Sequence, residues 1–266
     1  MAKKGTNYLN LNDRLLFRDD GERKRETGLW TRDKLALLGY YLPAFAKLCH
    51  DKAGGWHYLD GFAGHGVNRT PGTPLAKGTA LLGATQQPRA NRCVLVERHK
   101  PDVAALTRRL NGLPHVTILE GDCNLLIDDA LAHFENRRLP GLCVLDPEGL
   151  ELNWQTVARC GEYRQGRYPF ELLIYFSTPG AARAAGVQDQ RFAEGVQRRL
   201  TNLYGNESWR AIANDQLNGL LPPGEAGHLY LSRYEDQLRG LGYSTVLHRA
   251  VLRTEGALVY HLVFAT

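Results

Sequence analysis

The stretch WHYLDGFAGHG, residues 56–66, decides how the rest of the chain is interpreted. A short apolar run over residues 56–60 ends in an acid, and a glycine-rich turn follows it at once. The glycines are spaced as GxxGxG, whereas dinucleotide-binding folds use GxGxxG at a helix that receives a pyrophosphate. Glycine permits positive φ and lets the backbone approach a ligand closely. The stretch therefore predicts a buried strand followed by a binding turn for a ligand without phosphate.

Short apolar runs alternate with helical patterns along most of the chain. A helix is expected over residues 30–48, where Leu35, Leu38, Leu42 and Phe45 recur at three- and four-residue spacing. Further strands are expected at residues 93–97, 116–122, 142–147 and 170–177, and helices at residues 78–86, 101–110, 124–137 and 153–163. Such alternation is typical of βαβ units, which build a parallel sheet covered by helices on both faces.

The two ends of the chain depart from this alternation. Residues 1–29 are polar and are expected to form a loosely ordered arm ahead of one domain, residues 30–266, with a helical insertion at about 178–240. The last residues predict an antiparallel β-hairpin around Thr254–Gly256. Together the segments predict an α/β fold: a Rossmann-like sheet of the class I methyltransferase type, mostly parallel, with an antiparallel C-terminal hairpin and an N-terminal helix.

Composition narrows the class of protein. Of the 266 residues, 43% are hydrophobic and 23% are charged, as in an ordinary globular domain. No apolar run reaches the roughly 20 residues of a membrane-spanning helix, and no apolar segment follows the N-terminal lysines as in a secretory signal. We therefore expect a cytoplasmic protein without a membrane partner. The formal charge of +5 permits a polyanionic partner such as nucleic acid.

The cysteines and histidines show no metal-binding pattern. The cysteines are scattered, without CxxC or Cys…His spacing, at Cys49, Cys93, Cys123, Cys143 and Cys160. This spacing disfavours both a disulfide framework and a zinc site, so no metal is expected. His65 and His99 lie near expected strand ends but have no partner at ligand spacing, and we expect no role for them.

The residues after the strands must distinguish between functions, because alternation alone also permits a dehydrogenase or a flavodoxin-like protein. In such sheets ligands bind beyond the carboxyl ends of the strands. Acids stand at the ends of four of the expected strands, at Asp60, Glu97, Asp122 and Asp146. Asp60 suits the cationic methionine end of S-adenosylmethionine, Glu97 its ribose hydroxyls and Asp122 its adenine amino group. We therefore predict S-adenosylmethionine as the cofactor, with contacts from Asp60, Gly61, Phe62, Ala63, Gly64, Gly66, Glu97, Asp122 and Cys123.

The loop Asp146-Pro147-Glu148-Gly149 is the expected chemical centre. In amino-methyltransferases a (D/N)PP(Y/F) loop holds an exocyclic amine, and its acid and a backbone carbonyl accept the amine protons. This chain keeps Asp-Pro but has Glu148 and Gly149 in place of the second proline and the stacking aromatic; Asp-Pro-x-Gly also occurs in tRNA guanine-N2 methyltransferases. Asp146, Pro147 and Glu148 are therefore the candidate catalytic residues, and a purely structural turn is the alternative.

With these motifs the sequence resembles the three-Cys-motif partner (TcmP) family, a bacterial and phage-associated group with a predicted methyltransferase-like fold. The resemblance runs through most of the chain and is carried by residues 30–35 with 40–42, 58–64, 78–79, 146–149, and 203–205 with Trp209. It implies the fold, the cofactor and a partner protein that bears the cysteine motif, and it says little about the substrate. Glu148 stands where the family usually carries Phe.

We expect an S-adenosylmethionine-dependent methyltransferase that acts on an amine such as a nucleic-acid base. The alternative is a catalytically silent Rossmann-like module that binds a partner. The missing aromatic favours the module, whereas four carboxylates around one cleft favour an enzyme. A nuclease or hydrolase is disfavoured because the chain shows no HxH, DxD or Ser/His/Asp arrangement.

Two groups of residues are candidates for substrate binding. Thr31 and Lys34 lie one turn apart on the first helix, which either is plain helix surface or folds over the site. In the helical insertion, Arg198 and Arg199 with Trp209 suit phosphate contact and base stacking. The alternative for the insertion is a helical subdomain in which Trp209 belongs to the core and the arginines are solvated.

Overall fold

β2 (His57–Asp60) is the central strand of the sheet, and all four of its residues are buried. The computed structural model describes residues 13–163, 169–187, 190–222 and 224–266, and within them this sheet has seven strands. The strand order is β6 (Val116–Glu120), β5 (Arg92–Glu97), β2, β7 (Gly141–Leu145), β8 (Glu171–Phe176), β10 (Leu258–Ala265) and β9 (Val246–Leu252). The first five strands in this order run parallel, whereas β10 is antiparallel to both of its neighbours.

The strand order confirms the predicted fold. The chain moves outward from β2 to β5 and β6 and then returns to β7 and β8 on the other side, so the sheet has a switch point between β2 and β7. An antiparallel strand inserted beside the last parallel strand, here β10 beside β8, is the class I methyltransferase arrangement. The β9–β10 hairpin turns through residues 253–257, as the sequence predicted.

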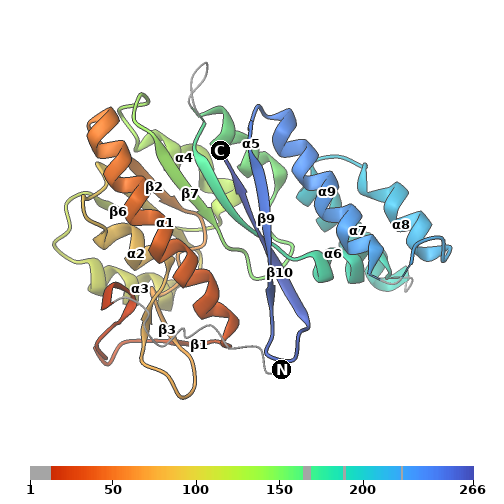
Figure 1. Cartoon of the computed structure of the whole chain (residues 1–266), viewed down its shortest axis with the longest axis horizontal. Helices are drawn as coiled ribbons and strands as arrows, with labels where there is room; N and C mark the ends of the chain where they lie inside the picture. Colours follow the sequence, from red (N-terminus) through yellow and green to blue (C-terminus); the bar gives the residue numbers. More distant parts are fainter. Residues whose placement is uncertain (1–12, 164–168, 188–189, 223) are drawn as a thin grey trace, which may run out of the picture.

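Helices cover both faces of the sheet (Figure 1). Tyr58 and Leu59 are neighbours in β2 and enter opposite cores, because successive side chains of a strand point to opposite faces. The Tyr58 face is covered by α1 (Trp30–Ala53), α2 (Thr79–Thr85) and α3 (Lys100–Leu110), and the Leu59 face by α4 (Cys123–Ala132) and α5 (Trp154–Glu162). α1 runs to Ala53 rather than residue 48, and α4 ends at Ala132 rather than residue 137.

The segment before α1 is not the loosely ordered arm that its polarity predicted, at least over residues 13–29. Leu15, in a 3₁₀ turn over Asp13–Leu15, is only 3% exposed and belongs to the core beneath α1. Further along, β1 (Arg25–Glu26) pairs with β3 (Val67–Arg69), which in turn pairs with β4 (Ala76–Lys77). One buried leucine and one short strand therefore anchor this segment; residues 1–12 lie outside the described residues.

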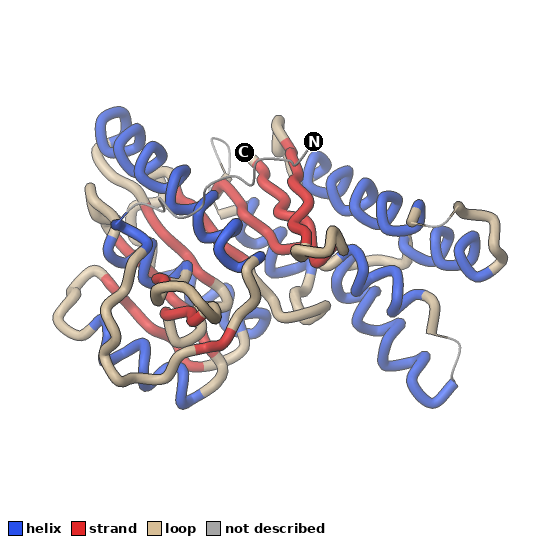
Figure 2. Tube along the Cα trace, turned by 60° about the horizontal axis from the view of Figure 1, so that its bottom comes forward, coloured by secondary structure: helices blue, strands red, loops and turns tan. Residues whose placement is uncertain are grey.

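The helical insertion lies beyond the hairpin edge of the sheet (Figure 1, Figure 2). It contains α6 (Thr178–Ala185), α7 (Gln190–Tyr204), α8 (Trp209–Leu217) and α9 (Glu225–Gly240). Fully buried tyrosines join it to β8: Tyr234 lies 4.6 Å from Phe176 and 6.0 Å from Tyr204, between ring centroids. In the described part of the chain, no helix combines the length and the apolar character needed to span a bilayer.

The contact between α2 and β2 provides a test of the packing. We expect Gly83→Ala to destabilise the protein by about 1–2 kcal/mol, although alanine favours a helix over glycine by ~1 kcal/mol. A methyl group at this position would lie 2.1 Å from Tyr58, and Tyr58 is fixed by the hydrogen bond that its hydroxyl donates to Thr79 O at 2.9 Å. Urea unfolding of the variant and the wild type measures the difference.

The matched control is Gly195→Ala on α7, where a methyl group would have no neighbour within 4 Å. There the helix preference acts alone, and the change should stabilise the protein by up to ~1 kcal/mol. Equal effects at both positions would show that Tyr58 does not restrict α2.

Candidate active site

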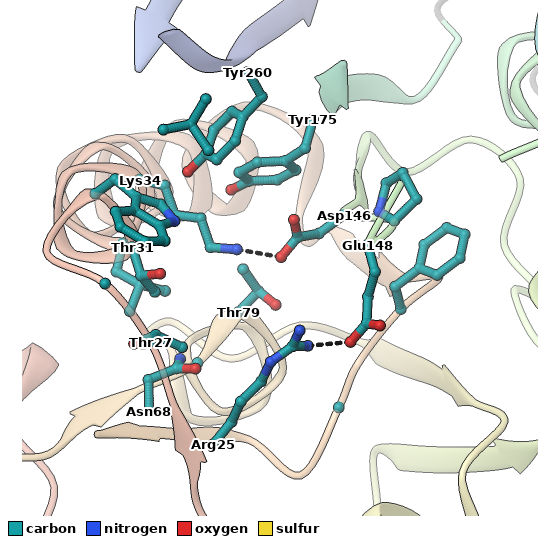
Figure 3. Close-up of a pocket in the computed structure, with 18 of the residues that line it drawn as sticks. Arg25, Thr27, Thr31, Lys34, Asn68, Thr79, Asp146, Glu148, Tyr175 and Tyr260 are labelled. Carbon is teal, nitrogen blue, oxygen red and sulfur yellow. Dashed lines mark hydrogen bonds and ion pairs between the residues drawn. The ribbon is translucent and has the colours of Figure 1, made fainter. Parts of the chain in front are cut away.

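A cavity of about 630 Å³ lies at the carboxyl ends of β2, β7 and β8. Its walls come from the start of α1, the turn after β2, the loop after β7 and the β9–β10 hairpin (Figure 3). The volume falls within the roughly 300–1,000 Å³ of small-molecule sites, and the position adjoins the switch point, where doubly wound sheets bind ligands. Among the predicted site residues, the cavity brings together Thr31, Lys34, Phe62, Ala63, Gly64, Gly66, Asp146, Pro147 and Glu148.

Lys34 and Asp146 form an ion pair within this cavity (Figure 3). The ammonium group of Lys34, on α1, contacts Oδ2 of Asp146, in the loop after β7. The same ammonium lies 4.6 Å from the centre of the Tyr175 ring, a cation–π contact. The two side chains are 13% and 23% exposed, so solvent screens their attraction only partly. The pair holds α1 over the site and leaves Oδ1 of Asp146 without a hydrogen bond from the described residues.

A second ion pair joins the N-terminal segment to the same loop. Arg25 of β1 contacts the carboxylate of Glu148, and both side chains are more than half exposed, at 57% and 61%. An exposed pair of this kind contributes little stability by itself. The pair instead affects the shape of the site, since it joins residues 25–28, which form one wall of the cavity, to the loop after β7.

Backbone hydrogen bonds hold the glycine turn to β7 and β5, the strands on the two sides of β2. Gly61 donates its N–H to Val144 O at 3.0 Å, and Ala63 donates its N–H to Val96 O at 2.9 Å. Gly64 has a φ of +58°, and no heavy atom lies within 4 Å of the position that a Cβ would take. Gly64 also lines the cavity, so its backbone is accessible to a ligand at close range.

Asp60 lies beneath the cavity and is completely buried. It accepts a hydrogen bond from the Phe62 N–H at 3.1 Å, and its Oδ2 has no partner among the described residues. Burial raises the pKa of this carboxyl from its ordinary value of 3.8 to about 7, with a smaller contribution from the negative charge of Asp146. The nearby Thr79 hydroxyl, the Phe62 N–H and Lys34 each lower the pKa by less than burial raises it. Asp60 therefore changes charge near neutral pH.

Besides Asp60 and Gly61, three of the predicted cofactor residues do not line the cavity. Glu97 accepts the N–H groups of Gly64 at 2.8 Å and His99 at 2.7 Å, and Asp122 accepts the Asn124 N–H at 2.8 Å as the N-cap of α4. Cys123 is 2% exposed, and its Sγ would lie 2.7 Å from a Cβ at Gly61. These contacts give each residue a structural role, and the cofactor contacts remain predictions.

The predicted substrate residues of the insertion lie outside the cavity. The structure corrects the substrate-binding role predicted for Trp209. Its side chain is 3% exposed in the core of the insertion, and its indole N–H donates to Thr201 Oγ1 at 3.2 Å. Arg210 stacks on the indole at 4.6 Å, so the ring offers no free surface for a base. Arg198 and Arg199 are exposed on α7, and phosphate binding by them stays a prediction.

Several cavity residues were missed by sequence reasoning. Tyr175 of β8 and Tyr260 of β10 lie in apolar runs, where an aromatic residue normally indicates core. His65 lies in the glycine turn itself, which was a usable signal, although we expected no role for it. It is 5% exposed in the cavity wall, and burial lowers its pKa to about 4. His65 is therefore neutral at physiological pH.

The chain is similar in fold to several solved methyltransferase structures at low sequence identity. A putative O-methyltransferase from Klebsiella pneumoniae is 10% identical, with a TM-score of 0.46, and the match covers 87% of this chain and 80% of that one. The O-methyltransferase TomG from Streptomyces achromogenes, in complex with SAM, is 13% identical with the same coverage and TM-score. A SAM-dependent methyltransferase from Anabaena variabilis is 11% identical, covers 87% and 83%, and has a TM-score of 0.40.

These likenesses concern the arrangement of sheet and helices, and the fold assignment rests on the strand order itself. Neither a protein-family model nor a curated protein matches the chain. The resemblance to the three-Cys-motif partner family gains no support from these comparisons.

The buried carboxyl of Asp60 should make stability depend on pH. As the pH rises from about 4 to 7, the unfolded chain loses this proton while the folded chain keeps it, which lowers the unfolding free energy by up to ~1.4 kcal/mol per pH unit. Asp60→Asn removes this dependence. The stability of the variant relative to wild type should therefore increase from pH 4 to 7 and level off above pH 7, measured by urea unfolding. A difference that does not change with pH would show that Asp60 ionises normally.

Proposed function

We propose that the protein binds S-adenosylmethionine and transfers its methyl group to an acceptor held beside Asp146. One observation carries the proposal: the glycine turn after β2 and the Asp146 loop after β7 open into a single cavity at the switch point of a class I methyltransferase sheet. In this assignment the turn holds the methyl donor and the Asp146 loop holds the acceptor.

The described residues fit the cofactor. Gly64 offers an open backbone, and the buried carboxyl of Asp60, whose pKa burial raises to about 7, can ionise near the position proposed for the cationic end of the cofactor. Glu97 ends β5 and Asp122 comes shortly after β6, where the ribose and the adenine would lie. Their carboxylate oxygens that accept backbone N–H groups each retain a lone pair for a further hydrogen bond.

The Asp146 loop can orient an amine acceptor. When bound, the cofactor supplies a methyl group that its positively charged sulfur makes electrophilic. Lys34 fixes Oδ2 of Asp146, which leaves Oδ1 to accept an N–H from the acceptor and to take the proton that the nitrogen loses. A Pro147 backbone carbonyl is a second acceptor in the same loop. A nucleic-acid base is one form of such an amine, and the loop offers no ring to stack on it.

A catalytically silent partner-binding module is the second candidate. Both acids of the chemical loop already have cationic partners from the same chain, Lys34 and Arg25, and this favours a structural loop. A partner of the kind implied by the three-Cys-motif resemblance would belong to this case. Binding and transfer assays separate the two candidates, because a silent module transfers no methyl group.

Cofactor binding is tested by calorimetry with S-adenosylhomocysteine, the demethylated product. We expect a Kd of the order of micromolar, about −8 kcal/mol, and a loss of at least tenfold in Gly64→Ala, because the methyl group would be added at a residue that lines the cavity. The control is Gly72→Ala, which has a φ of +73°, equally open space and no place in the cavity wall. Both variants carry a similar backbone cost of about 1–2 kcal/mol, so a difference in affinity reports on the site. Wild-type protein that binds no S-adenosylhomocysteine would exclude this function.

The role of Asp146 is tested by separating binding from transfer. We expect Asp146→Asn to lose at least 100-fold in transfer of a tritium-labelled methyl group to acceptors in a cell extract, because the amide cannot take a proton. Its affinity for S-adenosylhomocysteine should stay within about twofold of wild type, since Asp146 is assigned to the acceptor. Parallel loss of both would place Asp146 in the cofactor site, and full transfer would remove it from the mechanism.

A further inference from the structure

Two tyrosine hydroxyls in the cavity wall have no hydrogen-bond partner among the described residues. They belong to Tyr175, which is only 3% exposed, and to Tyr260. The rings meet edge to face, with 5.5 Å between their centroids, and Figure 3 shows both hydroxyls directed toward the Lys34 side chain. Buried hydroxyls normally have partners, so this pair suits a ligand group that accepts hydrogen bonds.

The three side chains offer mainly donors. Burial and the negative charge of Asp146 raise the pKa of both tyrosines, so both are neutral phenols and able to donate. The Lys34 ammonium lies 4.6 Å from the Tyr175 ring centre and has three N–H groups, of which Asp146 engages one. The matching ligand group is one with several acceptor lone pairs and negative charge.

The position of the tyrosines assigns this group to the acceptor rather than to the cofactor. Tyr175 and Tyr260 stand on β8 and β10, which lie on one side of β7, whereas the glycine turn and Glu97 follow β2 and β5 on the other side. Asp146 at the end of β7 lies between them. The proposed methyl donor and the tyrosines therefore flank Asp146 from opposite sides.

We propose that Lys34, Tyr175 and Tyr260 form an oxyanion subsite that binds a terminal acid group, a carboxylate or a phosphate monoester, of the methyl acceptor. The proposal rests on the proposed function, because it names the class of acceptor. Arg183 and Arg253 line the same cavity and are exposed, and Arg253 stacks on Trp30 at 5.3 Å. Exposed cations at the cavity attract an anion before it reaches the tyrosines.

The depth of the subsite selects a terminal acid on a small molecule. Tyr175 is nearly inaccessible from outside, and a backbone phosphodiester carries polymer on both of its sides. A terminal acid group can enter such a site by itself, whereas a backbone phosphodiester could enter only together with the polymer on both of its sides. The acid group therefore belongs to a small acceptor rather than to the backbone of a nucleic acid.

The test measures anion binding in the presence of saturating S-adenosylhomocysteine, with acetate, benzoate and inorganic phosphate as probes at constant ionic strength. Benzamide is the uncharged counterpart of benzoate. We expect wild type to bind at least one of the anions and not benzamide, as measured by calorimetry and thermal shift. Tyr175→Phe/Tyr260→Phe should lose at least tenfold in that affinity, while affinity for S-adenosylhomocysteine changes less than twofold. Tyr40→Phe, at a 68% exposed position outside the cavity, should match wild type.

Other outcomes overturn the proposal in distinguishable ways. If the double variant loses affinity for S-adenosylhomocysteine but not for methylthioadenosine, which lacks the amino acid, the subsite holds the carboxylate of the cofactor. If a single-stranded oligonucleotide binds in a tyrosine-dependent manner and the small anions do not, the acceptor is a nucleic acid. If wild type binds none of the anions, or the variants bind them equally, there is no oxyanion subsite. Tyrosine-dependent anion binding without S-adenosylhomocysteine binding would retain the subsite and reject the methyltransferase.

Discussion

Strand β2 is four residues long, yet it is hydrogen-bonded along both edges and covered on both faces. Backbone groups buried in this way are satisfied only when β5 and β7 pair with it simultaneously. Because these strands are parallel, the segments that follow them leave the sheet at the same edge. After β2 the chain turns toward β5, and it returns to β7 only later. The loop that follows β2 and the loop that follows β7 therefore lead away from each other at the switch point. The cavity is the space that this separation leaves.

The same geometry concentrates acids where solvent is scarce, and Lys34 offsets their repulsion. Asp60 is fully buried, and the charge of Asp146 adds to the effect of burial on its pKa. Lys34 acts on both carboxyls, through its ion pair with Asp146 and through a weaker field at Asp60. An acid whose pKa lies near neutral pH is common at reactive sites, and buried acids in plain structural roles are usually paired. The electrostatics of this cavity are therefore consistent with binding a charged ligand.

Segments that are distant in sequence complete the walls. Residues 25–28 reach the cavity because β1 pairs with β3, and Tyr260 reaches it because β10 is inserted between β8 and β9. Each placement depends on strand pairing and not on the local sequence. The proposed division of the site follows from this construction, with a donor side built from the first half of the sheet and an acceptor side built from the second half.

The sequence by itself determined the alternation of strands and helices, the C-terminal hairpin and the polar residues at the strand ends, because each has a local signature in periodicity or turn chemistry. It also placed Lys34 one turn after Thr31, although it left their role open. Only the tertiary structure decided which polar residues meet: Glu97 and Asp122 bind nearby backbone, Trp209 is core, and Tyr175 and Tyr260 line the cavity. An aromatic in a buried strand has the same local pattern whether it faces the core or a cavity, and the difference arises only when distant strands and α1 pack around it.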